Sequence, residues 1–245
     1  MAYICIDTSG NLTSLTLAEK GAAKATLTHE GPYHVESVAP LLVEILATNG
    51  IRKKDLEFVS VVVGPGGFSG LRVGVTFASV FAVALSLPVV ELSALELRVL
   101  GIQGSWDYVL AVEDGKRKEV FFGVYQTDKT RQILVLEGHA KPEDLASLLL
   151  EEVPDLFDCS KRVVVAGGGL ARYREQLSFT SSFSLDEGVS MEQNAEVLAQ
   201  LSFLEFSSRR AIDPKAVTVK YLRDADARSN YLVLRKQISG SEVET

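Results

Sequence analysis

The sequence has little of what metal and redox sites are made of. Its 245 residues include two cysteines, Cys5 and Cys159, and three histidines, His29, His34 and His139. The cysteines match no metal-binding or redox spacing, and no two histidines are placed to form a local metal site. We therefore expect no metal site in this chain, and we expect free cysteines in a reducing, cytoplasmic compartment.

Basic residues are outnumbered as well. The chain has 25 Lys plus Arg against 32 Asp plus Glu, a net charge of −7. This balance argues against a protein that binds nucleic acid over most of its surface. Any contact with nucleic acid would have to be local. One stretch, 209–236, holds eight basic residues against three acidic ones, a composition that also suits a solvated helix face and tail.

The N-terminus lacks the basic region and the apolar run of a leader. A stretch of 18 uncharged residues, 73–90, is long enough for a membrane span. It is interrupted by Gly74, Thr76 and Ser79, and Pro88 precedes residues typical of a strand. These residues favour a buried helix that runs into a strand, and we expect no membrane contact.

Hydrophobic periodicity repeats along the chain. Short strands over 3–30 precede a helix from residue 34, an apolar strand, the loop GPGGFSGLRVG (64–74) and a second helix. Two landmarks then recur: Asp114 stands 107 residues after Asp7, and VVVAGGG stands 102 residues after VVVGPGG. Two matches near one offset indicate a duplicated unit.

The duplication predicts an α/β fold of the actin-like ATPase and sugar-kinase class (ASKHA, ribonuclease H-like), in which two subdomains flank a cleft. The predicted N-terminal subdomain is 1–104. The predicted C-terminal subdomain is 105–245 and includes the basic segment 209–236.

The glycine-rich loop fits no common phosphate or catalytic motif. Leu71 stands where a Walker loop needs lysine, and Ser69 stands where a dinucleotide fingerprint needs its third glycine. The run from Gly67 to Gly70 lacks one residue of a nucleophile elbow. A flexible loop whose amides and helix N-terminus can accept an anion remains. The structural alternative is that Ser69 caps the helix and the glycines allow close packing on the sheet.

These residues together resemble the TsaB (YeaZ) family, the bacterial accessory proteins of tRNA threonylcarbamoyladenosine synthesis. The resemblance rests on the loop and on three further motifs: Ile6-Asp7-Thr8-Ser9, His34-Val35-Glu36 and Tyr221-Leu222-Arg223. It is strongest over residues 3–100. The family's loop usually reads Gly-Pro-Gly-Ser-Phe-Thr-Gly-Leu-Arg, so Gly67 and Ser69 replace a serine and a threonine here. These replacements keep the backbone amides but remove a hydroxyl.

The resemblance implies a non-catalytic scaffold or activating subunit. It would pair with a TsaD-like catalytic paralogue that forms N6-threonylcarbamoyladenosine at position 37 of tRNAs reading codons that start with A. A TsaE-like ATPase would join the complex, and the chain would form a homodimer alone. The chain would need no cofactor of its own, with ATP and magnesium on the partner subunits. TsaD holds a metal with two histidines four residues apart on a helix, whereas Val38 follows His34 here, so we expect His34 to be an exposed first-turn residue.

Three sets of candidate site residues follow. The vestigial nucleotide or phosphate loops would be Asp7, Thr8, Ser9, Gly64, Pro65, Gly66, Gly67, Phe68, Ser69, Gly70 and Arg72. Small residues every four positions leave one face of the second helix free for close approach. That face and the first helix predict a partner interface of Val38, Leu41, Leu42, Ile45, Gly74, Phe77, Ala78, Phe81 and Ala82. The predicted tRNA contacts are Arg223 and Arg228.

Two other functions remain open at this point. An independent ATP-dependent phosphotransferase of the same fold would use Asp7 or Asp114 near magnesium. A peptidase that uses Ser69 is the more distant alternative, because only three histidines are available as a base.

Overall fold

The computed structural model describes residues 1–31, 34–128, 131–179, 183–186, 191–223 and 235–236. The chain forms two compact units, 1–101 with 188–221 and 102–187 with 222–245. The sequence placed the division at 104 and assigned everything beyond it to the second subdomain. The structure differs because α6 (Met191–Ser207) packs on the first sheet, where the Tyr3 hydroxyl donates to the Ala199 carbonyl at 2.8 Å.

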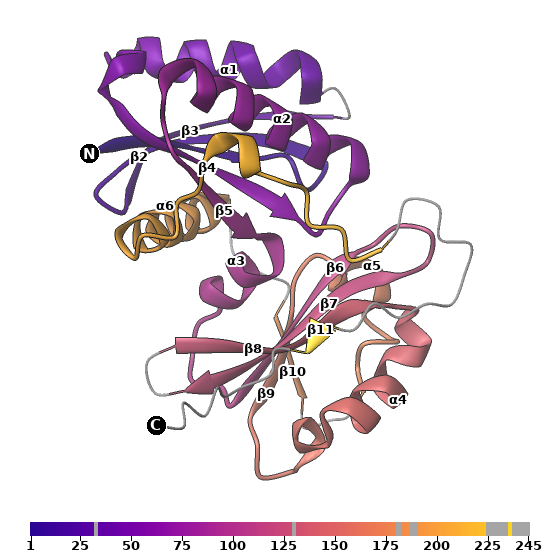
Figure 1. Cartoon of the computed structure of the whole chain (residues 1–245). Coiled ribbons are helices and arrows are strands. Elements are labelled where there is room, and N and C mark those ends of the chain that lie inside the picture. Colours follow the sequence, from indigo (N-terminus) through magenta and orange to yellow (C-terminus); the bar gives the residue numbers. More distant parts are fainter. Residues whose placement is uncertain (32–33, 129–130, 180–182, 187–190, 224–234, 237–245) are drawn as a thin grey trace, which may run out of the picture. The chain divides into compact units, whose positions relative to one another are not determined.

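A five-stranded sheet is the centre of the first unit (Figure 1). Its order is β3-β2-β1-β4-β5, with β1, β2 and β3 antiparallel and with β4 and β5 parallel to β1. The strands are β1 (Ala2–Asp7), β2 (Leu12–Glu19), β3 (Ala22–Glu30), β4 (Leu56–Gly64) and β5 (Val89–Ser93).

Alternation along β1 gives this sheet two covered faces. Ile4 and Ile6 lie in the core under α1 (His34–Thr48) and α2 (Phe68–Leu85). Tyr3 and Cys5 lie in the opposite core, under α3 (Ala94–Gly101) and α6. Successive side chains of a strand point to opposite faces, so a strand that is apolar at every position must be covered on both.

The second unit repeats the arrangement around a sheet of order β10-β9-β6-β7-β8-β11. Its strands are β6 (Tyr108–Asp114), β7 (Val120–Asp128), β8 (Arg131–Ala140), β9 (Val163–Ala166), β10 (Phe183–Asp186) and β11 (Arg235–Lys236). The helices α4 (Pro142–Glu152) and α5 (Leu170–Tyr173) pack on one core with Leu110, Val112 and Phe122. Short 3-10 helices lie at Lys53–Asp55, Pro154–Phe157 and Pro214–Ala216 (η1, η2 and η3).

The two sheets confirm the predicted duplication. The order β3-β2-β1-β4-β5 corresponds strand for strand to β8-β7-β6-β9-β10, with a parallel pair at β1 and β4 and again at β6 and β9. This is the duplicated actin-like ATPase fold. The copies differ most in the helix after the glycine loop, since α2 has 18 residues and α5 has four.

Helix α2 occupies the uncharged run that the sequence singles out. Among the described residues it is the one helix long and apolar enough to cross a membrane, a test that core helices also pass. It runs into β5 as predicted, but its burial is partial. Gly74, Ala78 and Ala82 are covered, whereas Val80 is 64% exposed.

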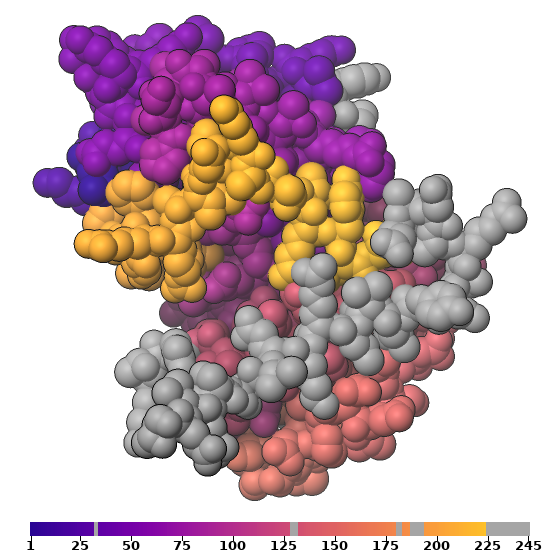
Figure 2. All heavy atoms as spheres, in the orientation of Figure 1, coloured from indigo at the N-terminus to yellow at the C-terminus, as the bar shows by residue number. Residues whose placement is uncertain are grey.

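Segment 208–221 packs along another side of α2 through η3, and its gold atoms lie against purple atoms of the first unit in Figure 2. The Ser79 hydroxyl donates to the Pro214 carbonyl at 2.7 Å. Val217 and Val219 pack against the α1 and α2 core. We call segment 208–221 the strap. Because the strap covers a second side of α2, the helix needs little polar surface there.

Candidate functional site

The glycine-rich loop joins β4 to α2. Gly64 ends the strand with φ of 128° and is linked to Pro65 by a cis peptide bond. Gly67 is the N-cap in an extended conformation, and its carbonyl accepts the first helical bond from the Leu71 amide at 2.9 Å. The expectation that Ser69 caps the helix is therefore wrong, because Ser69 already lies within the first turn.

The turn between β1 and β2 packs directly on this loop. The Gly67 amide donates to the Ser9 carbonyl at 2.7 Å, and the Thr8 hydroxyl donates to the Gly70 carbonyl at 2.8 Å. Asp7 Oδ1 accepts from both the amide and the hydroxyl of Ser9, at 2.9 and 2.6 Å. The two segments predicted to face a nucleotide thus lie together, bonded to one another.

The glycines of the loop permit this contact. A Cβ on Gly66 would collide with the Ser9 carbonyl oxygen, and a Cβ on Gly70 or Gly74 would collide with Thr8. Gly67 is different, because a Cβ there would lie 3.6 Å from the Ser9 carbonyl oxygen in ordinary contact. Close packing therefore accounts for three of the glycines, while position 67 has room for a side chain.

Phe68 and Arg72 interact with the strap. The Arg72 guanidinium lies 3.8 Å from the centre of the Phe68 ring, and its Nε donates to the Tyr221 hydroxyl at 2.9 Å. The Phe68 and Tyr221 rings are 5.2 Å apart. Arg72 therefore binds Tyr221, and it is absent from the lining of the neighbouring pocket.

His34 is buried, contrary to the expectation of an exposed first-turn residue. It is 6% exposed, and its Nδ1 shares a hydrogen bond of 2.7 Å with the Thr13 hydroxyl, which also lies 3.0 Å from the Ser37 hydroxyl. Burial lowers the pKa of His34 below its ordinary value of 6.5, although Asp7 acts in the opposite direction. The imidazole is therefore neutral at neutral pH.

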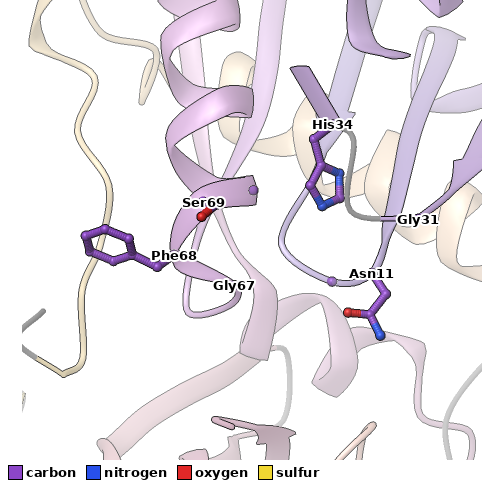
Figure 3. A pocket seen from close by; sticks show the side chains of 8 residues that line it. Asn11, Gly31, His34, Gly67, Phe68 and Ser69 are labelled. Carbon is purple, nitrogen blue, oxygen red and sulfur yellow. The ribbon is translucent and has the colours of Figure 1, made fainter. Parts of the chain in front are cut away.

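An open pocket of about 450 Å³ lies between the loop and the turn, and Figure 3 shows the His34 ring reaching from the start of α1 toward the first turn of α2. The described residues that line it are Gly10, Asn11, Gly31, His34, Gly67, Phe68, Ser69 and Gly70. None of them is charged at neutral pH. The pocket offers an amide, an imidazole, a hydroxyl and helix amides, which suit a small polar ligand better than a magnesium-bound triphosphate.

The residues of the alternative functions are not assembled in the described parts of the chain. Asp7 is bonded to Ser9, and Asp114 is paired with Lys116 and Arg172 in the other unit. No group of three or more His, Cys, Asp or Glu residues among those described is placed to hold a metal ion. No hydrogen bond there links Ser69 to His34, as a peptidase nucleophile and base would require.

A family model described as TsaD, tRNA N6-adenosine threonylcarbamoyltransferase, matches residues 29–230, most of the chain. The chain belongs to this family. The tRNA threonylcarbamoyladenosine biosynthesis protein TsaB of Escherichia coli is 26% identical over 231 residues, which cover 91% of this chain and 95% of that protein. The Bacillus subtilis TsaB is 23% identical over 237 residues, which cover 96% and 100%.

A solved structure of similar fold is YeaZ from Pseudomonas aeruginosa. It has a TM-score of 0.73 and 24% identity, and the match covers 90% of this chain and 99% of that one. With the near full-length TsaB relatives, this confirms the resemblance to TsaB (YeaZ) that the sequence indicated.

The predicted partner interface needs correction. Six of its residues are buried in the core of the first unit and cannot contact a partner without rearrangement: Val38, Leu42, Ile45, Gly74, Ala78 and Ala82. The small face of α2 packs against Thr8 and the sheet. Leu41, Phe77 and Phe81 are partly exposed. The apolar residues on the outer side of these helices, Val35, Val43, Val80 and Val83, are exposed instead.

The predicted tRNA contact at the basic segment also needs correction. Segment 209–236 is divided between the two units, with residues up to 221 in the first and later ones in the second. The Arg223 guanidinium donates to Glu119 Oε2 at 2.6 Å and lies 5.5 Å from the Phe121 ring, and its side chain is 17% exposed. It is an internal ion pair of the second unit. Arg228 lies outside the described residues.

Sequence reasoning missed Thr13 and Asn11. Thr13 shares the face of β2 that carries Leu15 and Leu17 into the α1 core. Strand alternation therefore placed Thr13 under α1, and a polar residue at a core-facing position was the signal available for it. Asn11 gave no signal, because an Asn after Gly10 is ordinary in a turn.

Proposed function

We propose that this chain is a non-catalytic scaffold or activating subunit that pairs with a TsaD-like catalytic paralogue. Family membership and the TsaB relatives assign the chain to tRNA threonylcarbamoyladenosine biosynthesis. The complex would form N6-threonylcarbamoyladenosine at position 37 of tRNAs that read codons starting with A. The observation that carries the proposal is the loop at 64–70, which packs on the neighbouring turn and on Tyr221 and whose pocket has no charged lining residue among those described.

The outer faces of α1 and α2 support a protein partner. The two helices pack side by side on the sheet. Val35 is 74%, Val43 61%, Val80 64% and Val83 43% exposed. Exposed aliphatic side chains concentrated on neighbouring helices mark protein interaction sites when they form a patch. We propose this outer face, with Phe77 and Phe81 at its edge, as the partner surface in place of the small-residue face.

The remaining parts of the proposal concern the other components. A TsaE-like ATPase would join the pair, and ATP and magnesium would be bound by the partner subunits. The chain itself would need no cofactor and would form a homodimer when the partner is absent. The complex would act in the cytoplasm, where its tRNA substrates are. Contact with tRNA would occur through the complex.

Depletion of the chain tests the role in the cell. Mass spectrometry of total tRNA nucleosides should show loss of threonylcarbamoyladenosine, and expression of the wild-type chain should restore it. An unchanged level of the nucleoside in cells without the chain, and without a duplicate of it, would contradict the assignment.

A surface variant tests the pairing. Val80→Arg places a charge on the proposed partner face and should abolish co-purification with the TsaD-like paralogue. Leu150→Arg is the matched control, because Leu150 is 56% exposed on α4 of the second unit. Retention of the complex by Val80→Arg, or equal loss in both variants, would show that α2 is not the partner surface.

A further inference from the structure

The turn between β6 and β7 has an unusual backbone for its sequence. Lys116, Arg117 and Lys118 have φ values of 58°, 51° and 62°, so three consecutive L-residues occupy the left-handed region. That region is disfavoured for residues with a Cβ, and turns that need it normally use Gly, Asn or Asp. A turn that served only to join two strands would be more stable with those residues. The presence of three cations at these strained positions suggests a use for their charge.

Backbone bonds fix this turn in place. The Gly115 amide donates to the Glu119 carbonyl at 2.9 Å, and the Glu119 amide donates to the Lys116 carbonyl at 3.0 Å. Asp114 Oδ1 accepts from the Lys116 amide at 2.9 Å. The basic side chains are therefore presented from a defined loop at the end of a buried hairpin.

Asp114 and Glu119, which flank the turn, are each paired with a cation other than Arg117 and Lys118. Asp114 Oδ2 lies 3.2 Å from Lys116 Nζ and 3.5 Å from an Arg172 nitrogen. Glu119 accepts from Arg223. Arg117 and Lys118 are exposed, and within the described part of the chain neither has a hydrogen-bond or ion-pair partner. Two uncompensated positive charges thus project from a chain whose net charge is −7.

We infer that Arg117 and Lys118 contact the phosphate backbone of tRNA when the complex binds its substrate. This inference rests on the proposed function, which provides the polyanion. None of the large apolar side chains exposed among the described residues lies in the turn, whereas a protein interface usually has an apolar centre. Two adjacent cations without apolar neighbours suit contacts to phosphates. Such contacts add affinity and position the RNA without reading its sequence.

The experiment compares two double variants in the complete complex with the TsaD-like partner. Arg117→Gln with Lys118→Gln removes the two charges, and Lys53→Gln with Lys54→Gln removes an exposed basic pair from η1 of the first unit. Binding of an unmodified tRNA transcript is measured between 50 and 200 mM salt. The first variant should bind about tenfold more weakly and lower the slope of log K against log[salt] by about 2, because each lost phosphate contact contributes about 0.9. The η1 variant should match the wild type.

Conservative and structural controls separate the outcomes. Arg117→Lys keeps the charge and should keep the slope, and circular dichroism should be unchanged in every variant. An unchanged slope in the Arg117 and Lys118 double variant would overturn the inference. Normal tRNA binding with loss of the protein partner would also overturn it and would assign the turn to an acidic protein surface. Failure of the wild-type complex to bind tRNA would instead count against the proposed function.

Discussion

The turn after β1 and the turn after β6 hold the same place in two copies of one unit, yet they differ in chemistry. The first is uncharged beyond Asp7 and is bonded to the glycine loop through Thr8 and Ser9. The second carries three cations and is held by ion pairs to Arg172 and Arg223. The strand order is the same in the two copies, whereas the residues and contacts of the two turns differ. The first turn packs on the glycine loop, and the second presents exposed cations.

The largest effect on stability should come from replacing two equivalent glycines, Gly66 and Gly168, by alanine. A Cβ on Gly66 would meet the Ser9 backbone and lie 2.9 Å from the Ser9 Cβ, whereas the nearest atom at Gly168 is Glu113 Oε2 at 2.7 Å, the end of a flexible side chain. Gly66→Ala should lower the free energy of unfolding by about 2 to 3 kcal/mol, and Gly168→Ala by less than about 1 kcal/mol. Urea unfolding followed by circular dichroism measures both. Equal losses would mean that the two loops are packed alike.

The anchors of the two turns should differ in their response to salt. Thr8→Val removes a buried donor to Gly70 and should cost about 1 kcal/mol at any ionic strength. Arg223→Ala leaves Glu119 beside His139 without its donor and should cost about 1 to 2 kcal/mol at low salt. The Arg223 loss should shrink in 1 M NaCl, where charges are screened. A salt-independent loss for Arg223→Ala would contradict an electrostatic anchor.

The smallest effect should be the loss of stability at acidic pH that His34 causes. The unfolded His34 binds a proton near pH 6.5, and the folded one binds it only at lower pH because burial lowers its pKa. Below pH 6.5 the unfolded state therefore holds more protons, so stability falls by at most about 1.4 kcal/mol per pH unit. His34→Gln should reduce the loss between pH 7.5 and 5.5. An identical pH dependence in the variant would remove His34 from the explanation.

Much of the fold was predictable because its signals are local. Strand alternation and the recurrence of Asp7 and of the glycine loop gave the duplication, and the structure shows the same strand order twice. The pairing of the first turn with the loop also followed from that fold. The burial of His34 did not, because Thr13 and Gly70 reach it from other elements.

The partner face, too, could not be predicted from local sequence patterns alone. A helical stripe identifies residues on one side of α1 or α2, but the choice between core and partner depends on what packs there. The sheet covers Val38 and Ala78, and the outer valines remain. Arg223 is similar, because its partner Glu119 is 104 residues away in the sequence.

Reconstituted transfer tests the central claim most directly. Purified TsaD-like paralogue and this chain are tested alone and together in a mixture that also holds the TsaE-like ATPase, magnesium-ATP, tRNA and the threonylcarbamoyl adenylate, and threonylcarbamoyladenosine is measured by mass spectrometry. We predict product only when both proteins are present, none from this chain alone, and none with Val80→Arg. Product formed by this chain alone, or an equal rate from the paralogue without it, would contradict its assignment as a non-catalytic activating subunit.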